Sequence, residues 1–217
     1  EFDIITSSEL DSATSNILAK LTSAIRPVVF AGAGVRISGT HDMFLEVISK
    51  VGVPVVTGWN AHDIIPNDHP QYAGRPGSVG DRAGNFTVQN ADFLLVLGSR
   101  LNIRQVSYNW KSFARHAWIA QVDIDPAELS KPTLSIDLPI QADLKGFLKK
   151  LNDKLKDHHI LESHMAYLQW CQERTKRYPV VLPEYWESEK INPYCFIDRL
   201  FSVLKSDEII VTGDGTA

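Results

Sequence analysis

The stretch that decides the fold is RPVVFAGAGVRISG, residues 26 to 39. An apolar run, Val28 to Ala31, follows a proline and leads directly into the turn Gly32-Ala33-Gly34. A short apolar run that ends in small residues is typical of a buried parallel strand followed by a tight turn. A helix is predicted to begin near Thr40, with this residue as its cap. The stretch therefore predicts a strand, a glycine turn and a helix in succession.

The glycine turn has two interpretations. Its backbone N–H groups bind a phosphate or another dipolar ligand, or its glycines only make a corner in the chain. The dinucleotide-binding fingerprint is incomplete, because Ile37 stands at the position of the third glycine. The next apolar run, Val53 to Val56, leads into Thr57-Gly58-Trp59-Asn60, which offers no acid for a ribose hydroxyl. The sequence therefore disfavours NAD binding in its usual mode and leaves both interpretations open.

Predicted strands alternate with predicted helices along most of the chain. Further apolar runs span residues 93–97, 118–122, 133–136 and 138–140, and helical patterns span residues 8–24, 40–52 and 143–156. This alternation predicts an α/β fold, a doubly wound parallel sheet of about six strands with helices on both faces. Ligands of such sheets bind outside the carboxyl ends of the strands. The residues that follow each strand are therefore the candidate site.

Composition excludes several classes of protein. The chain has 217 residues, 44% of them hydrophobic, and a net charge of −4 without a basic face, which argues against nucleic acid as a partner. No apolar run is long enough to span a bilayer, and residues 1–10 lack the pattern of a signal peptide. The two cysteines, Cys171 and Cys195, lack zinc spacing, so we expect two buried thiols in a cytoplasmic protein.

Polar residues follow two of the predicted strands. Arg100, Asn102 and Arg104 alternate after the strand at residues 93–97, and in an extended loop they would point to one side and clasp phosphates or a carboxylate. The alternative is a solvated loop held by salt bridges. Asp123 and Asp125 follow the strand at residues 118–122. They would hold a ribose or a metal, or they would form hydrogen bonds within a turn before Pro126.

Two other regions could carry function, a long loop and a group of histidines. Residues 59–84, rich in glycine, proline and aspartate, form a loop that is too long for a simple connection, and such loops are usually functional. His158, His159 and His164 do not converge on a helix, so we expect surface residues and no metal site.

The motifs together resemble the central domain of thiamine-diphosphate-dependent enzymes of the acetolactate synthase family. The resemblance covers about residues 8–151, with a weaker tail to residue 217. The matching segments are RPVVFAGAG (26–34), GVPVVT (52–57), YAGRPGSVGDRAGNFTVQNADFLLVLGSRL (72–101), VDIDPAEL (122–129) and Ala142-Asp143.

The resemblance implies a longer parent enzyme with a pyrimidine-binding domain, this central domain and a diphosphate-binding domain. It implies a sirtuin-like sheet for residues 1–157, a helical linker for 158–191 and the start of the diphosphate-binding domain for 192–217. The parent would use thiamine diphosphate and Mg²⁺ to decarboxylate a 2-keto acid and transfer the acyl carbanion, as a homodimer or homotetramer. The central domain of such enzymes binds FAD, ADP or neither.

The family's nucleotide contacts can be carried over to matching positions of this chain. They are Gly32, Ala33, Gly34, Trp59, Gly77, Gly98, Arg100, Asn102, Arg104, Asp123, Glu128 and Asp143. The chain departs from the family at Pro76, where acetolactate synthases usually have histidine, and this departure argues against FAD.

No catalytic or metal-binding residue is predicted within the chain itself. Gly213-Asp214-Gly215 matches a loop of the diphosphate-binding domain and not its magnesium motif, and the activating glutamate belongs to another domain. We therefore expect an inactive fragment of a longer enzyme. The alternative is a freestanding nucleotide-binding or regulatory module without catalysis.

Overall fold

The computed structural model describes residues 5–205 and 207–211. The chain divides into two compact units, Glu1–Tyr178 and Pro179–Ala217. The predicted loop Gly213-Asp214-Gly215 lies outside the described residues. Among the described helices, none combines the length and the apolar character that crossing a bilayer requires.

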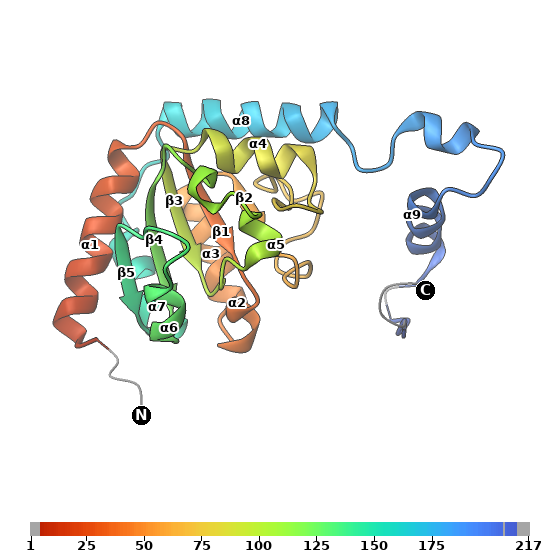
Figure 1. Cartoon of the computed structure of the whole chain (residues 1–217). Coiled ribbons are helices and arrows are strands. Elements are labelled where there is room, and N and C mark those ends of the chain that lie inside the picture. Colours follow the sequence, from red (N-terminus) through yellow and green to blue (C-terminus); the bar gives the residue numbers. More distant parts are fainter. Residues whose placement is uncertain (1–4, 206, 212–217) are drawn as a thin grey trace. The chain divides into compact units, whose positions relative to one another are not determined.

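The first unit is built on a parallel sheet in the strand order β2-β1-β3-β4-β5 (Figure 1). All neighbouring strands pair in parallel. The strands are β1 (Pro27–Ala31), β2 (Val55–Thr57), β3 (Phe93–Leu97), β4 (Trp118–Asp123) and β5 (Leu138–Gln141). The predicted α/β class is therefore confirmed.

The described part of the chain has five strands in this sheet, where the sequence suggested about six. The apolar run at residues 133–136 is a turn and an irregular segment. Pairing with β4 begins only at Asp137, whose N–H donates to Ile119 O (3.0 Å) and whose carboxylate accepts from Ile119 N (2.8 Å). Residues 208–211 also form no strand.

Alternating residues of the central strands enter two separate cores. In β3, Phe93, Leu95 and Leu97 enter one core, whereas Leu94 and Val96 enter the other. Side chains of a strand alternate between the faces of a sheet, so a strand that is apolar throughout must be covered on both faces. This explains why β3 is an uninterrupted apolar run.

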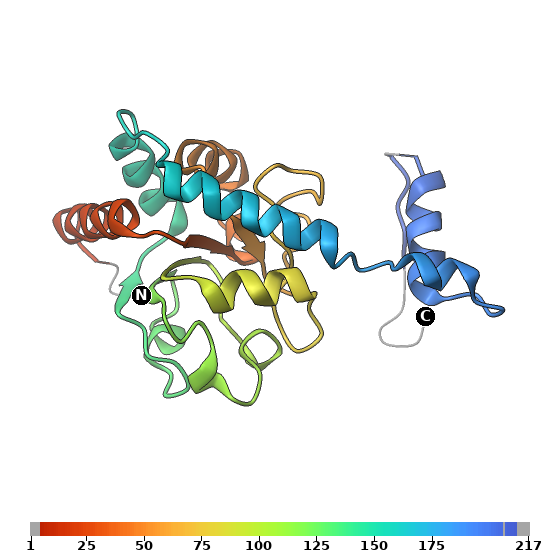
Figure 2. The same cartoon turned by 90° about the horizontal axis from the view of Figure 1, so that it is seen from above.

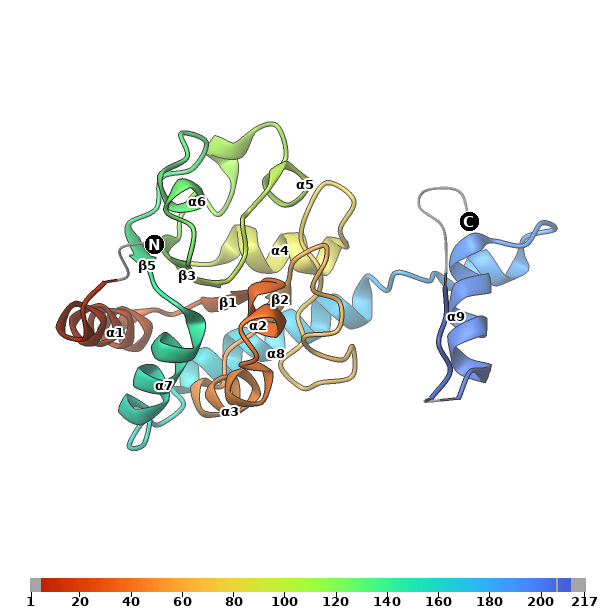
Figure 3. The same cartoon turned by 90° about the horizontal axis from the view of Figure 1, so that it is seen from below.

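Helices cover both faces of the sheet, as predicted (Figure 3). Helices α1 (Ser7–Ser23), α3 (His41–Val51) and α7 (Leu144–Lys154) pack on the first core. Helices α4 (Arg82–Asn90) and α8 (Glu162–Arg177) pack against each other and contribute to the second core (Figure 2). The short helices α2 (Gly34–Ile37), α5 (Ile103–Val106), η1 (Trp110–Ser112) and α6 (Pro126–Ser130) lie in the loops.

Gly52 and Asp143 cap ends of α3 and α7, whereas the predicted cap Thr40 does not act as one. Gly52 ends α3 in the left-handed conformation, with a φ of 68°, and the Asp143 carboxylate accepts from Lys145 N at 2.7 Å at the start of α7. Thr40 precedes α3 but does not cap it. Its hydroxyl donates to Val35 O instead (3.2 Å), because α2 brings that carbonyl within reach.

Helix α8 belongs to the first unit, which extends to Tyr178. Tyr167 donates from its hydroxyl to Thr87 O of α4 (2.7 Å), and His164 lies 3.0 Å from Ala24 O. The compact unit therefore extends past residue 157, where the sequence suggested a domain boundary. That boundary, as a division between family domains, stays a prediction.

The second unit contains η2 (Pro183–Glu187) and α9 (Pro193–Val203). The Tyr185 and Tyr194 rings stack with their centroids 6.1 Å apart, and Cys195 is buried beside them. Asn192 caps α9 by accepting from Tyr194 N (2.9 Å), and Pro193 stands in the first turn, where proline is favoured. Cys171 in the first unit is also buried, and both thiols are free, so the expectation of two buried thiols is confirmed.

Candidate functional site

A cavity of about 500 Å³ lies at the carboxyl ends of β1 and β3. Strand order reverses between these two strands, since β2 lies on one side of β1 and β3 on the other. Such a switch point leaves a crevice between the loops, which is where α/β sheets bind ligands. The cavity volume is in the range of small-molecule sites. It is lined by residues 32–34, 37, 38, 58, 60, 98–100, 102, 105, 123, 124 and 142–144.

The two glycine turns touch each other at the floor of this cavity. A Cβ atom on Gly32 would lie 2.2 Å from Gly98 O, and one on Gly34 would lie 2.6 Å from Gly98 Cα. Gly98 itself has a φ of 57°, which favours glycine. The glycines are therefore required by the contact between the turns.

The same contact uses backbone N–H groups that were candidates for ligand binding. Gly32 N donates to Leu97 O (2.9 Å) and Gly34 N donates to Gly98 O (3.0 Å). The carboxyl ends of β1 and β3 lie side by side in the sheet. Of the two interpretations of the glycine turn, the corner interpretation describes Gly32 and Gly34, since their N–H groups hold the two turns together.

The arginine pair predicted after β3 does not form. The chain turns at Asn102, which accepts from Arg104 N (2.9 Å) and begins α5, so Arg104 lies in a helix and not in an extended loop. Arg100 lines the cavity, but its Nε donates to Glu128 Oε1 (2.5 Å). This loop is therefore the solvated loop held by salt bridges that we gave as the alternative to a clasp of two arginines. It places one guanidinium group, that of Arg100, at the cavity.

Two carboxylate side chains also line the cavity, and their negative charge is opposite to that of Arg100. Asp123 ends β4 and accepts from Asp125 N (3.0 Å), and Asp143 caps α7. Burial raises the pKa of Asp123, and the nearby Glu128 and Asp125 carboxylates raise it further, against the opposing hydrogen bond from Asp125 N. The Asp125 carboxylate accepts a hydrogen bond from Ala127 N (2.9 Å) and caps α6. The turn interpretation of this acid pair is confirmed, and Asp123 also faces the cavity.

Most predicted contacts line the cavity, but a few do not. Those that line it are Gly32, Ala33, Gly34, Gly98, Arg100, Asn102, Asp123 and Asp143. Those that do not are Trp59, Gly77, Arg104 and Glu128. The Trp59 ring is half exposed, with its centroid 6.2 Å from that of His62, and a Cβ on Gly77 would lie 2.4 Å from Arg104 O. The predicted site is therefore only partly assembled in one place.

Other residues of the cavity wall were not predicted from the sequence. They include Ile37, Ser38, Ile124 and Leu144. Each lies within a few residues of a predicted strand end or helix cap. This nearness in the sequence was the one sign that the residue would reach the cavity. The apolar side chains of Ile37, Ile124 and Leu144 supply a wall that a flat ring of a ligand would contact.

The long loop between β2 and α4 is held by its own contacts. Asp81 accepts from Arg75 N (2.7 Å) and from Gly84 N (2.5 Å), where it caps α4. Arg75 also donates to the Tyr72 hydroxyl (2.7 Å), and burial raises the pKa of Tyr72 to about 12. Contacts within the segment therefore hold this loop in its conformation.

The expectation that His164 is a surface residue is wrong. His164, Tyr167 and Cys171 form the buried face of α8, with the spacing of three and four residues typical of a helix. Burial lowers the pKa of His164. Within residues 5–205 and 207–211, no group of three potential metal ligands comes together.

Comparison with known proteins identifies the family. Residues 14–151 match the sequence profile described as "Thiamine pyrophosphate enzyme, central domain". The chain belongs to this family. The match covers all five strands of the sheet and the cavity between them.

The chain is also similar to acetolactate synthases. It is 33% identical over 203 residues to "Acetolactate synthase" of Mycobacterium bovis, covering 91% of this chain and 32% of that protein. It is 30% identical to "Acetolactate synthase large subunit" of Lactococcus lactis, covering 94% of this chain and 34% of that protein. The chain therefore spans about a third of the length of these relatives, and the predicted resemblance is confirmed.

Proposed function

We propose that this chain is the nucleotide-binding central segment of an acetolactate synthase-like enzyme, and that its cavity takes an adenine-containing diphosphate such as ADP. The observation that carries this proposal is the cavity of about 500 Å³ at the β1–β3 switch point. It combines one guanidinium, two carboxylates and an apolar wall. These groups match the phosphate, the sugar hydroxyls and the base of a nucleotide.

Each polar side chain has a distinct role in this proposal. Arg100 pairs with the diphosphate, since it lines the cavity and its side chain is 76% exposed. Asp123 and Asp143 accept hydrogen bonds from sugar hydroxyls. The side chains of Ile37 and Ile124 contact the base. The backbone N–H groups of Gly32 and Gly34 contribute rigidity and no ligand contact.

ADP fits this cavity better than FAD. The resemblance placed a nucleotide contact at Gly77, and residues 74–77 do not line the cavity. Gly77 instead packs against Arg104 O, and Ser78 N donates to the same carbonyl (2.8 Å). Pro76, which replaces the usual histidine, is buried in this segment. The flavin end of FAD would therefore lack the contacts that the family resemblance suggests.

We infer the reaction of the parent enzyme from the family. When bound with Mg²⁺ in the parent enzyme, thiamine diphosphate would supply the electron sink for decarboxylation of a 2-keto acid and transfer of the acyl carbanion. We assign no catalytic or metal-binding residue to this chain, and we expect no turnover from it alone. Its contribution is a rigid domain that binds a nucleotide within a cytoplasmic homodimer or homotetramer.

Calorimetry with ADP and with FAD tests the proposal. We expect ADP to bind, and the Arg100→Ala variant to lose roughly 1.5–3 kcal/mol of binding free energy, as for a hydrogen bond to a charged group. Arg115→Ala is the matched control, since Arg115 is exposed and does not line the cavity. Absence of heat with both ligands, or equal affinity in wild type and Arg100→Ala, would refute it.

A further inference from the structure

Lys131, immediately after α6, has its ammonium group surrounded by acceptors. Its Nζ donates to the backbone oxygen of Arg100, to Leu101 O (3.3 Å) and to Glu128 Oε2 (3.0 Å). An ammonium group has three protons to donate, and here each has an acceptor. Two of the acceptors are consecutive carbonyls of the loop that follows β3, so Lys131 ties α6 to this loop.

The loop that Lys131 holds is conformationally demanding. Leu101 has a φ of 44°, in the left-handed region that residues with a Cβ rarely adopt. Its side chain is fully buried in the second core. Its neighbours Ser99, Arg100 and Asn102 all line the cavity. The backbone conformation at Leu101 therefore determines the positions of these three side chains. Such a conformation persists only where contacts with surrounding residues hold it.

Lys131 also shares a carboxylate with Arg100. The Glu128 side chain is 12% exposed and lies between the two cations, with Arg100 Nε at 2.5 Å and Lys131 Nζ at 3.0 Å. Partial burial acts to raise the pKa of Glu128, but the hydrogen bonds from Lys131 and Arg100 outweigh it and hold the pKa below its usual range. If Arg100 turned away, Lys131 would still neutralise Glu128, so no buried charge would be left unpaired.

We propose that Lys131 is a positioning residue of the cavity. It fixes the loop Gly98–Asn102 and, by neutralising Glu128, allows Arg100 to transfer its guanidinium from Glu128 to an anionic ligand. The second half of this inference rests on the proposed nucleotide binding. The first half does not, because the contacts of Lys131 with the loop are made between residues of the chain itself.

Hydrogen–deuterium exchange of the ligand-free protein tests the first half. Amides of Gln105, Val106 and Ser107 bond to carbonyls of Asn102 and Ile103, so their exchange reports on the loop and α5. We expect Lys131→Met to speed their exchange about tenfold or more, the equivalent of losing one hydrogen bond to a charged group. Lys131→Arg should restore most of the protection. Lys149→Met, at an exposed lysine of α7, is the control and should change nothing. Unchanged exchange in Lys131→Met would overturn the proposal.

ADP titration of the same variants tests the second half. We expect Lys131→Met to weaken ADP binding several-fold while its thermal unfolding midpoint stays near that of wild type, and Lys131→Arg to recover the affinity. Equal affinity in wild type and Lys131→Met would overturn the transfer of Arg100. Absence of binding in wild type would refute the proposed function instead, and the exchange result would still decide whether Lys131 holds the loop.

Discussion

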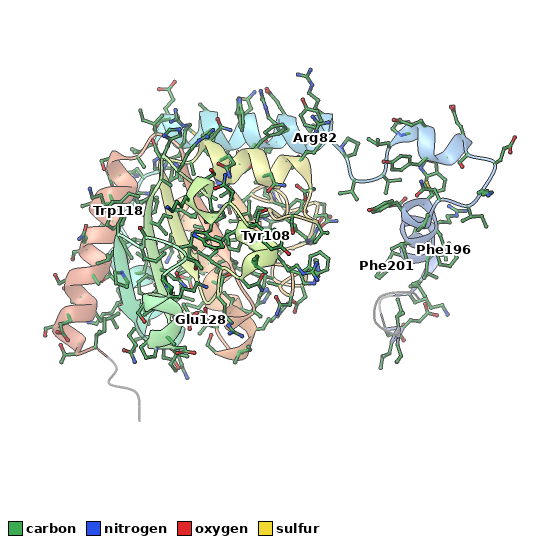
Figure 4. The ribbon with its side chains drawn as sticks, in the orientation of Figure 1. Arg82, Tyr108, Trp118, Glu128, Phe196 and Phe201 are labelled. Carbon is green, nitrogen blue, oxygen red and sulfur yellow. The ribbon has the colours of Figure 1, made fainter. Side chains whose placement is uncertain are left out.

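Helices α7 and α9 have much in common in sequence and differ in what they bury. Each has 11 residues, an Asx residue as its cap and an amphipathic pattern. Helix α7 of the first unit buries Leu144, Phe147, Leu148 and Leu151, whereas the corresponding stripe of α9 in the second unit leaves Phe196 54% and Phe201 64% exposed (Figure 4). A local pattern thus specifies a helix, but only a neighbouring element makes its apolar face part of a core.

The strongest test of this comparison replaces one phenylalanine in each helix. Phe147→Ala should lower the free energy of unfolding by about 3–5 kcal/mol, because a fully buried ring leaves a cavity in a packed core. Phe201→Ala should change it by less than about 0.5 kcal/mol, as for a surface position. Urea unfolding followed by circular dichroism measures both.

Equal losses in the two variants would contradict the comparison. They would mean that the α9 ring is buried in solution, for example by association of chains. Sedimentation at two protein concentrations would then show whether association is the cause.

A second test uses the buried histidine that ties α8 to the first unit. The carbonyl of Ala24 accepts from His164 Nε2, and Nδ1 has no hydrogen-bond partner among the described residues. Burial lowers the pKa of His164, opposed by the hydrogen bond to Ala24 and by the charge of Asp92. The unfolded chain therefore binds more protons than the folded one just below pH 6.5.

The contribution of neutral His164 to the free energy of unfolding is fully present above pH 6.5. It is lost as the pH falls toward the lowered pKa of the folded state. We expect the free energy of unfolding of wild type to drop between pH 7.5 and 5.5, with a slope of at most about 1.4 kcal/mol per pH unit for this one proton. His164→Gln should show a shallower drop. His159→Gln, at an exposed histidine, should follow wild type, and identical profiles for all three proteins would refute the role of His164.

The smallest expected effect concerns the end of the first unit. The Arg82 guanidinium lies 4.3 Å from the centroid of the Tyr178 ring, which in turn lies 5.4 Å from that of Phe86. An exposed cation–π contact contributes about 0.5–1 kcal/mol. Arg82→Ala should therefore speed hydrogen exchange of the Tyr178 amide, which bonds to Arg174 O, by about two- to fivefold. The Arg115→Ala control should not, and no change in Arg82→Ala would show that the last turn of α8 is held by other contacts.

Much of the fold could be predicted because long patterns carry its signals. The apolar runs of β1, β3 and β4 and the periodic stripes of α1, α3 and α7 stand out in the sequence. Helices α2 and α5 have only four residues each, too few for a period to show. The extra strand at residues 133–136 was expected because an apolar run does not reveal whether a neighbouring strand is within reach.

The site was predictable in location but not in detail. Residues that follow parallel strands meet at one edge of the sheet, and this rule found Gly32, Gly98, Arg100 and Asp123. It failed for Arg104, because the turn into α5 depends on the Asn102 cap. It also failed to pair Arg100 with Glu128, since the partner comes from a segment 28 positions later that only the folded chain brings near.

The contact between the glycine turns has a consequence for redesign of the ligand preference. Because the backbones of Gly32 and Gly98 meet without room for a methyl group, substitutions there would break the floor and not reshape it. The adjustable parts are the side chains at Ile37, Ser38 and Ile124, which can change size or polarity without moving the main chain. A library that varies these wall positions and leaves both turns untouched would explore new ligands on a preserved scaffold.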